Sequence, residues 1–281
     1  MPLTSVTFQC THDPAEAKKW FAGLIADEPV PMSVIATVAD ALIAEPARYE
    51  NPRWWSGRDA SGRVVAAFMH TPPYPLHVAL ATADQAVALA EQLAGRRDPL
   101  PGVGGRRGPA EAFRDAWVRL TRATARTRMG VGVFDLPQRP RLPFDVPGSY
   151  RRALREELAL ADTWAHDFAD AVHDSPGTAH SLRAHIEAGR VGFWVDGRRP
   201  VSMAVASPAN GGVTRISCVW TPVDLRGHGY ASAVVAALSS ERMDAGESCM
   251  LRTDLANPTS NKIYQALGYR RIGDDITIAF T

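Results

Sequence analysis

A short run of the sequence has the residue types and spacing of an anion-binding turn at the start of a helix. Gly227 and Gly229 let the backbone adopt positive φ, and they let a ligand approach main-chain N–H groups without an intervening Cβ. Arg226 places a cation at the rim, and the small residues Ala231 and Ser232 follow. The unpaired N–H groups of the first helical turn, with the positive end of the helix dipole, favour a pyrophosphate there.

This turn differs from two well-known phosphate-binding loops. Position 232 is Ser, so the dinucleotide pattern Gly-x-Gly-x-x-Gly is not met. No Gly-Lys-Ser/Thr follows, as it does in loops that bind nucleoside triphosphates. Because glycine-rich turns between a strand and a helix are common, the turn alone indicates anion binding without identifying the ligand.

A second polar segment follows at residue 257. Asn257 and Pro258 form a strong helix start, with Asn as the cap and Pro at the first helical position. Ser260 and Tyr264 are four residues apart and share a face of that helix. Gly268 and the next tyrosine then lead into a strand-like run.

Predicted strands and helices hold both segments in place. Residues 216–221 alternate and are β-branched, which predicts a strand leading into the turn. The Ala- and Val-rich run after the turn predicts a helix to about residue 245, and another strand begins near Met250. From residue 148 onward the predicted order is strand, two helices, three strands, helix, strand, helix and two strands.

Together the two segments resemble the acyl-CoA-binding motifs of the GNAT superfamily of N-acetyltransferases. The first of these motifs is written Arg/Gln-x-x-Gly-x-Gly/Ala, and Ala231 stands where Gly is commoner. The resemblance covers about residues 148–281. It implies an α/β fold with a mixed sheet, the acyl-CoA N-acyltransferase fold, with acetyl-CoA as co-substrate and no metal.

The resemblance also implies roles for individual residues. The turn would bind the coenzyme through Arg226, Gly227, His228, Gly229, Tyr230, Ala231 and Ser232. The strand before it would diverge from the next strand, so that main-chain groups of Val219 and Thr221 pair with the pantetheine arm and an N–H there polarises the thioester carbonyl. Asn257 and Ser260 would contact the coenzyme arm. Tyr264 would protonate the departing thiolate, since a phenol with an ordinary pKa of about 10 can donate to it.

The general base is the least defined part of the predicted site. Several acidic and histidine side chains lie where enzymes of the resembled family bind the acceptor: Asp162, His166, Asp167, Asp170 and His173. Most of them are expected to form a solvated helix face. We take Asp170, four residues from His166, as the candidate base, and a chain of water molecules is the alternative.

Proline content indicates where the chain divides. Four prolines fall between residues 137 and 147, and such a segment continues neither a helix nor an inner strand. The sequence therefore predicts a domain at residues 1–136, a linker at 137–147 and an acyl-CoA-binding N-acetyltransferase domain at 148–281.

The first half repeats the layout of the second. Residues 62–72 resemble residues 199–208 in pattern, and each run follows two helices, an aromatic strand and a turn. The next predicted strand, 76–82, enters its helix without Arg-x-x-Gly-x-Gly/Ala. We interpret the first half as a degenerate acyltransferase-like α/β domain that binds no coenzyme, and an unrelated α/β domain is the alternative. Residues 99–108 are predicted to form a solvated loop.

Composition excludes several classes of protein. The 281 residues carry a net charge of +1, which does not suggest a nucleic-acid partner held by bulk electrostatics. No apolar run approaches a membrane span, and the first residues lack the regions of a signal peptide. The three cysteines are scattered, so no disulfide framework or zinc site is indicated. We expect a cytoplasmic protein, of bacterial source given its many Ala and Arg residues.

Three functions remain open at this level. The first is an N-acetyltransferase that acts on the amine of a small molecule or peptide, by direct attack on acetyl-CoA. The second is a non-catalytic acyl-CoA-binding regulatory module. The third is an acyltransferase whose donor is a longer acyl-CoA or an aminoacyl-tRNA. The combination of Arg226, Gly229, Asn257 and Tyr264 favours the first. The N-terminal half is expected to form a wall of the acceptor site or a dimer contact, so a homodimer is also open.

Overall fold

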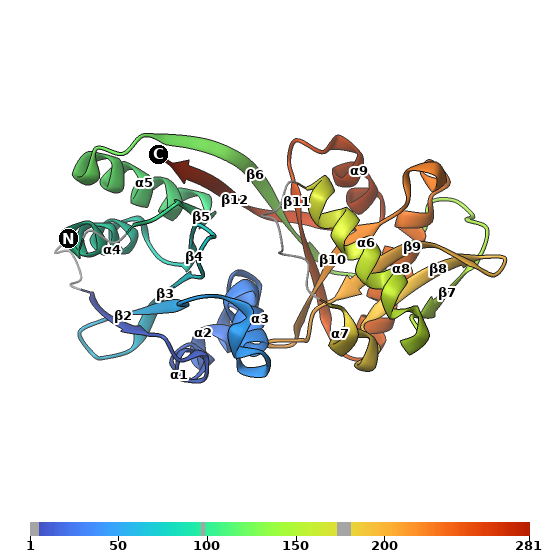
Figure 1. Ribbon diagram of the computed structural model, residues 1–281, viewed down its shortest axis with the longest axis horizontal. Helices are drawn as coiled ribbons and strands as arrows, with labels where there is room; N and C mark the ends of the chain where they lie inside the picture. The colour runs from blue at the N-terminus through green and yellow to red at the C-terminus, as the bar shows by residue number, and fades with distance from the viewer. Residues whose placement is uncertain (1–5, 97–98, 173–180) are drawn as a thin grey trace. The chain divides into compact units, whose positions relative to one another are not determined.

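The structure is a computed structural model that describes residues 6–96, 99–172 and 181–281 (Figure 1). The chain forms two compact units, each of mixed α/β structure. Unit 1 consists of Met1–Val133, Thr253–Ala256 and Ile272–Thr281, and unit 2 consists of Phe134–Arg252 and Asn257–Arg271. Both the N-terminal and the C-terminal segments of the chain therefore belong to unit 1.

Unit 1 is a mixed sheet with helices on both faces. Its strands follow the order β1-β2-β3-β4-β5-β12, with β4 and β5 parallel and the other neighbours antiparallel. One apolar core lies under α1, α2 and α3, and a second lies under α4 and α5. Its elements, apart from β12, are β1 (Thr7–Thr11), α1 (Pro14–Trp20), α2 (Ala22–Asp27), α3 (Pro29–Ala44), β2 (Arg53–Arg58), β3 (Val64–His70), β4 (Leu76–Leu80), α4 (Ala83–Arg96), β5 (Gly102–Arg106), α5 (Arg107–Thr121) and β6 (Ala125–Leu136).

The strand β5 corrects an expectation, because the sequence predicts a solvated loop over residues 99–108. Gly102 to Gly105 are buried, and β5 lies between β4 and β12. A Cβ on Gly105 would overlap the carbonyl oxygen of Val78, and a Cβ on Gly102 would overlap that of Ile278. Gly105 also has a φ of 115°. The glycines are needed because neighbouring backbones approach closely, which the local sequence does not show.

Unit 2 carries both segments that the sequence singles out. Its sheet order is β11-β10-β9-β8-β7, with β10 and β11 parallel and the other neighbours antiparallel. Helices α8 and α9 pack on one face, and α6 and α7 on the other. The elements are β7 (Ser149–Arg152), α6 (Leu158–Ala171), α7 (Arg183–Glu187), β8 (Val191–Asp196), β9 (Arg199–Ala206), β10 (Val213–Trp220), α8 (Tyr230–Asp244), β11 (Ser248–Asp254) and α9 (Pro258–Ala266). The last strand, β12 (Arg270–Phe280), follows α9 and lies almost wholly in unit 1.

The chain contains the same succession of elements twice. From β1 to β6 it runs strand, helices, three strands, helix, strand, helix, strand, and the same succession recurs from β7 to β12. The tandem arrangement inferred from the sequence is therefore present. The last strand has an unexpected place, because β12 pairs with β5 of the first copy, Ile276 opposite Gly105. The end of β6 in turn contributes Phe134 and Leu136 to the core of unit 2. The domain limits drawn from the proline-rich segment stay a prediction.

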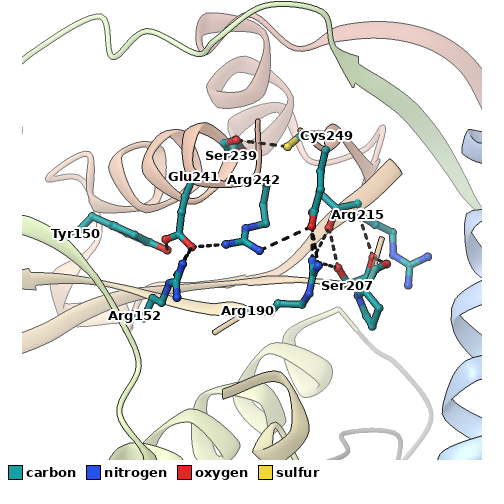
Figure 2. Close-up of polar contacts among 12 residues, drawn as sticks. Tyr150, Arg152, Arg190, Ser207, Arg215, Ser239, Glu241, Arg242 and Cys249 are labelled. Atoms are coloured by element: carbon teal, nitrogen blue, oxygen red, sulfur yellow. Dashed lines mark hydrogen bonds and ion pairs between the residues drawn. The ribbon is translucent and has the colours of Figure 1, made fainter. Parts of the chain in front are cut away.

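A charged network fixes the end of unit 2 where β10 and β11 are still paired (Figure 2). Arg190 and Glu247 form two hydrogen bonds, of 2.6 Å and 3.2 Å, and their side chains are 15% and 13% exposed. The same guanidinium donates to the carbonyl oxygen of Ser207 at 2.7 Å. The Ser248 N–H donates to the Gly212 carbonyl oxygen at 2.8 Å. These contacts join the starts of β8, β10 and β11 to the end of β9.

The network continues to the edge strand through the C-terminal end of α8 (Figure 2). The Tyr150 hydroxyl donates to Glu241 at 2.6 Å, and Arg152 donates to the same carboxylate at 2.9 Å. Arg242, which is 6% exposed, contacts Glu241 and lies 3.8 Å from Glu247. Burial raises the pKa of Glu241, but hydrogen bonds from Tyr150, Arg152 and Arg242 outweigh it and leave that pKa below its usual value.

Candidate active site in unit 2

The turn before α8 has the backbone geometry expected of an anion site. Gly227 and Gly229 lie in the left-handed region, with φ of 84° and 81°, and Gly229 is the N-cap of the helix. The Ala233 N–H donates to the Gly229 carbonyl oxygen at 3.0 Å, which closes the first helical turn. In an α-helix the N–H groups of the first residues, here Tyr230, Ala231 and Ser232, have no partner within the helix. They are available to an anion at this end of α8.

Side chains around the turn hold it in place. The Arg226 Nε donates to the Thr221 carbonyl oxygen at 3.0 Å, and the guanidinium lies 5.1 Å from the centre of the Trp220 ring. Arg226 is nevertheless exposed. Tyr230 is buried, and its hydroxyl donates to Asp196 at 2.7 Å, which raises the pKa of this phenol. The His228 ring is exposed and stacks on the Tyr230 ring.

A bulge in β10 redirects its main chain before the turn. Ser217 lies opposite Val205 and Trp220 lies opposite Met203, so β10 uses one residue more than β9 over this stretch. Cys218 takes up the extra length with a φ of 48°. The Trp220 carbonyl oxygen accepts a hydrogen bond of 3.0 Å from the Ser202 hydroxyl of β9, and Thr221 follows the end of the strand.

On the side of β10 away from β9, β11 leaves the ladder. The parallel pairing of β10 with β11 runs from Val213 opposite Ser248 to Ile216 opposite Leu251. Beyond Ile216 the two strands diverge, as the resemblance implies. Val219 and Thr221 come after the last residue of β10 that pairs with β11, and the Arg226–Thr221 hydrogen bond holds this end of the chain next to the turn at the start of α8. An extended ligand with amide groups can pair with such a strand edge.

Helix α9 begins at the predicted cap, Asn257, and carries Tyr264. The Asn257 side chain accepts a hydrogen bond from the Ser260 N–H at 3.1 Å, which makes it the helix cap. The Tyr264 ring is half-buried and meets the Tyr269 ring edge-on, with 6.1 Å between the ring centres. Burial raises the pKa of Tyr264 to about 12. Tyr264 and Val219 pack against the same apolar core.

The candidates for a general base are spread along α6. The Asp162 carboxylate accepts hydrogen bonds from the Leu182 N–H and the Ser181 hydroxyl, which gives it a structural role before α7. His166 is exposed, and its Nδ1 lies 2.7 Å from the Asp162 carbonyl oxygen. Asp170 is exposed near the end of α6. His173 lies outside the described residues. No contact joins Asp170 to the turn or to Tyr264 among the interactions of the described residues, so its role stays a prediction.

Two residues that the sequence did not predict to be near the glycine turn lie against it. The Phe144 ring and a Val146 methyl group lie against Gly229, where an added Cβ would overlap Phe144 Cε2 and lie 3.1 Å from Val146 Cγ2. Both residues belong to the proline-rich segment that the sequence assigns to a linker. The only local signal is a large apolar residue, Phe144, within a polar and proline-rich run.

Comparison with known proteins supports the fold. Residues 191–277 match the family model described as FR47-like protein. A GNAT-family acetyltransferase from Colwellia psychrerythraea is 11% identical, with 98% of both chains covered and a TM-score of 0.62. A GCN5-related N-acetyltransferase from Sphaerobacter thermophilus is 15% identical over 96% of this chain and 94% of that one, with a TM-score of 0.57.

A tandem relative matches as well. A tandem GNAT protein from the clavulanic acid biosynthesis pathway is 13% identical, with 99% of this chain and 98% of that chain covered and a TM-score of 0.58. No curated protein matches the sequence. At these identities the likeness establishes the fold, so the chain has the fold of the GNAT acetyltransferases over nearly its whole length. Among the helices that the structure describes, none has the length and apolar character needed to cross a membrane.

Proposed function

We propose that unit 2 is an acetyl-CoA-dependent N-acetyltransferase that acts on a primary amine. The observation that carries this proposal is the divergence of β10 from β11 beside the glycine turn. It brings a strand edge at Val219 and Thr221 next to the N-terminus of α8. A coenzyme with a pyrophosphate and an amide-containing arm requires this pair of features side by side. The fold, shared with GNAT acetyltransferases, supports the same conclusion.

Each group of residues has a part in the proposed reaction. The N–H groups of the first turn of α8, with Arg226 at the rim, bind the pyrophosphate. The main chain at Val219 and Thr221 pairs with the pantetheine arm, and an N–H from this edge stabilises the oxyanion that forms on the thioester carbonyl. Asn257 and Ser260, at the start of α9, border the arm.

The chemistry is acyl transfer by direct attack. The amine nitrogen forms a bond to the carbonyl carbon, the carbon–sulfur bond breaks, and the thiolate takes a proton from the Tyr264 phenol. The attacking nitrogen loses one proton, to Asp170 or to water, and a proton returns to Tyr264 before the next cycle. Because burial raises the pKa of Tyr264 to about 12, the phenol stays protonated at neutral pH. A thiol has an ordinary pKa of about 8.5, so the transfer from Tyr264 to the thiolate is itself uphill, and the proton that the nitrogen releases drives it forward when a proton returns to Tyr264.

A carboxylate introduced at Ala231 tests the donor site. Gly229 is a poor position for this test, since its positive φ and its contact with Phe144 would strain any side chain. Ala231 lies in the first turn of α8, where a carboxylate stabilises the helix. Two like charges about 5 Å apart, at an effective dielectric of about 20, repel by about 3 kcal/mol. We expect Ala231→Glu to weaken acetyl-CoA binding by about 100-fold in calorimetry, and Ala231→Gln to have little effect.

The outcomes separate the functions that the sequence leaves open. Binding by the wild type and by Ala231→Gln alone, followed by thiol release with an amine, supports the acetyltransferase. Binding without thiol release across a broad panel of amines instead favours a non-catalytic module. If the wild type does not bind acetyl-CoA, the proposal is wrong, and longer acyl-CoA or aminoacyl-tRNA donors are tested next.

A further inference from the structure

The segment from Arg139 to Pro147 lies along α8 and is fixed at both ends. At one end, the Arg139 guanidinium donates two hydrogen bonds of 2.7 Å to the carboxylate of Asp244, the last residue of α8. At the other end, the Pro147 carbonyl oxygen accepts a hydrogen bond of 2.8 Å from the Trp194 indole. We call residues 139–147 the strap.

The length of the strap matches the helix that it follows. Helix α8 has 15 residues and is therefore about 22 Å long at about 1.5 Å per residue. The five Cα–Cα steps from Arg139 to Phe144 span about 17 Å when extended, and the Arg139 side chain can reach over the remainder. Prolines at 140, 143 and 147 fix φ and favour an extended chain. The strap therefore has little slack, and its anchors determine where Phe144 lies.

Phe144 lies on Gly229, the N-cap of α8. Phe144 is 50% exposed, and its ring contacts Gly229 together with Val146. A phenyl ring offers no oxygen to the N–H groups of the first helical turn. The contact is apolar on one side and open to solvent on the other. The ring covers Gly229 without supplying a group that could replace an anionic ligand.

We propose that the strap is a cover on the donor site, with Phe144 resting on Gly229 in the free protein and moving off when the pyrophosphate of the donor reaches the turn. This inference rests on the proposed function of the turn. Donor affinity is then reduced by the fraction of molecules in which the cover is closed. Because Phe144 is half exposed, its contact is worth about half of the transfer free energy of a phenylalanine side chain, which corresponds to a reduction in donor affinity of about five-fold.

Calorimetric titration with coenzyme A, without an acyl group, measures this reduction. We expect Phe144→Ala to bind about five-fold more tightly than the wild type. Leu142→Ala is the matched control, because Leu142 is an exposed apolar residue of the strap and the atoms nearest to Gly229 belong to Phe144 and Val146 instead. Equal or weaker binding by Phe144→Ala overturns the cover while leaving the donor site intact. Absence of binding by both proteins overturns the donor site and the cover together.

Proteolysis measures movement of the strap without any assay of the reaction. Trypsin does not cleave before proline, so Arg139–Pro140 is resistant and Arg141–Leu142 is the tryptic bond within the strap. We expect saturating coenzyme A to increase the rate of cleavage at Arg141–Leu142. Asp244→Asn, which weakens one anchor, should increase that rate without ligand. A cleavage rate that coenzyme A leaves unchanged or lowers contradicts the proposal.

Discussion

Removing the Glu247 carboxylate should destabilise unit 2 by several kcal/mol. Glu247 makes two hydrogen bonds to Arg190, and both side chains are at least 85% buried. Loss of the carboxylate leaves the Arg190 guanidinium with the Ser207 carbonyl oxygen and the Thr214 hydroxyl as its remaining partners. The uncompensated charge, rather than the lost attraction, is the main cost of such a change.

The magnitude follows from the burial of the pair. Breaking a fully buried ion pair costs about 3–5 kcal/mol, and residual exposure places this pair near the lower limit. For Glu247→Ala we expect a loss of about 3 kcal/mol. For a protein of this size, that loss corresponds to a fall in Tm of about 6–12 °C.

Urea denaturation followed by circular dichroism measures the change, and a double variant identifies its cause. In Arg190→Met with Glu247→Leu, both charges are replaced by apolar side chains of similar size. The double variant should therefore regain most of the stability lost by Glu247→Ala. The Arg139–Asp244 pair is a control, since its side chains are more than half exposed and Arg139→Ala should cost less than about 1 kcal/mol. A loss below 1 kcal/mol for Glu247→Ala would refute the reasoning.

Three further changes have definite expected results. Gly105→Ala should destabilise unit 1 by about 2–3 kcal/mol in urea denaturation, because of the positive φ of Gly105 and the overlap of the new Cβ with Val78. Gly108→Ala is the control: Gly108 lies in open space on α5, so this change should be neutral or stabilising by up to about 1 kcal/mol. Similar effects of the two changes would contradict the account of β5. Glu241→Gln should cost about 2 kcal/mol at neutral pH. The folded pKa of Glu241 lies below its ordinary value of 4.5, so the stabilisation by the carboxylate is present above pH 4.5 and disappears as the pH falls through the folded pKa. A stability difference between the wild type and Glu241→Gln that persists in acid would contradict this account. Tyr264→Phe should lower kcat by about 100-fold with little change in donor affinity. The rate of the wild type should not fall near pH 10, because the pKa of Tyr264 is raised to about 12. Parallel losses of rate and donor binding in Tyr264→Phe would exclude the role of Tyr264 as the acid.

Local chemistry made the backbone of both segments predictable. The cap at Asn257 and the glycine turn at Gly227 and Gly229 depend on residues within a few positions of each other, so their sequence determines their backbone. The order of strands and helices was also readable, because buried faces leave a periodic pattern. The roles of Val219, Thr221 and Tyr264 in binding and catalysis stay predictions, because they concern a ligand.

Contacts between distant parts of the chain were not predictable in the same way. The bulge at Cys218 depends on the register between β9 and β10. The strand character of β5 depends on the close approach of Val78 and Ile278, while its own glycines are typical of a loop. The contact between Phe144 and Gly229 joins residues that are separated in the sequence by the four strands β7 to β10. Each of these features is set by a partner that local patterns do not identify.

The position of β12 has a consequence for how the chain reaches its folded state during synthesis. Strand β5 leaves the ribosome well before residues 272–281, which pair with it, so unit 1 has an open sheet edge until the last strand is made. Phe134 and Leu136, by contrast, are made before the rest of the core that they join in unit 2. A fragment that begins at residue 148 would carry β12 without its partner strand. Neither half is therefore expected to be an independent folding unit, and premature termination would leave unit 1 prone to aggregation through its exposed strand.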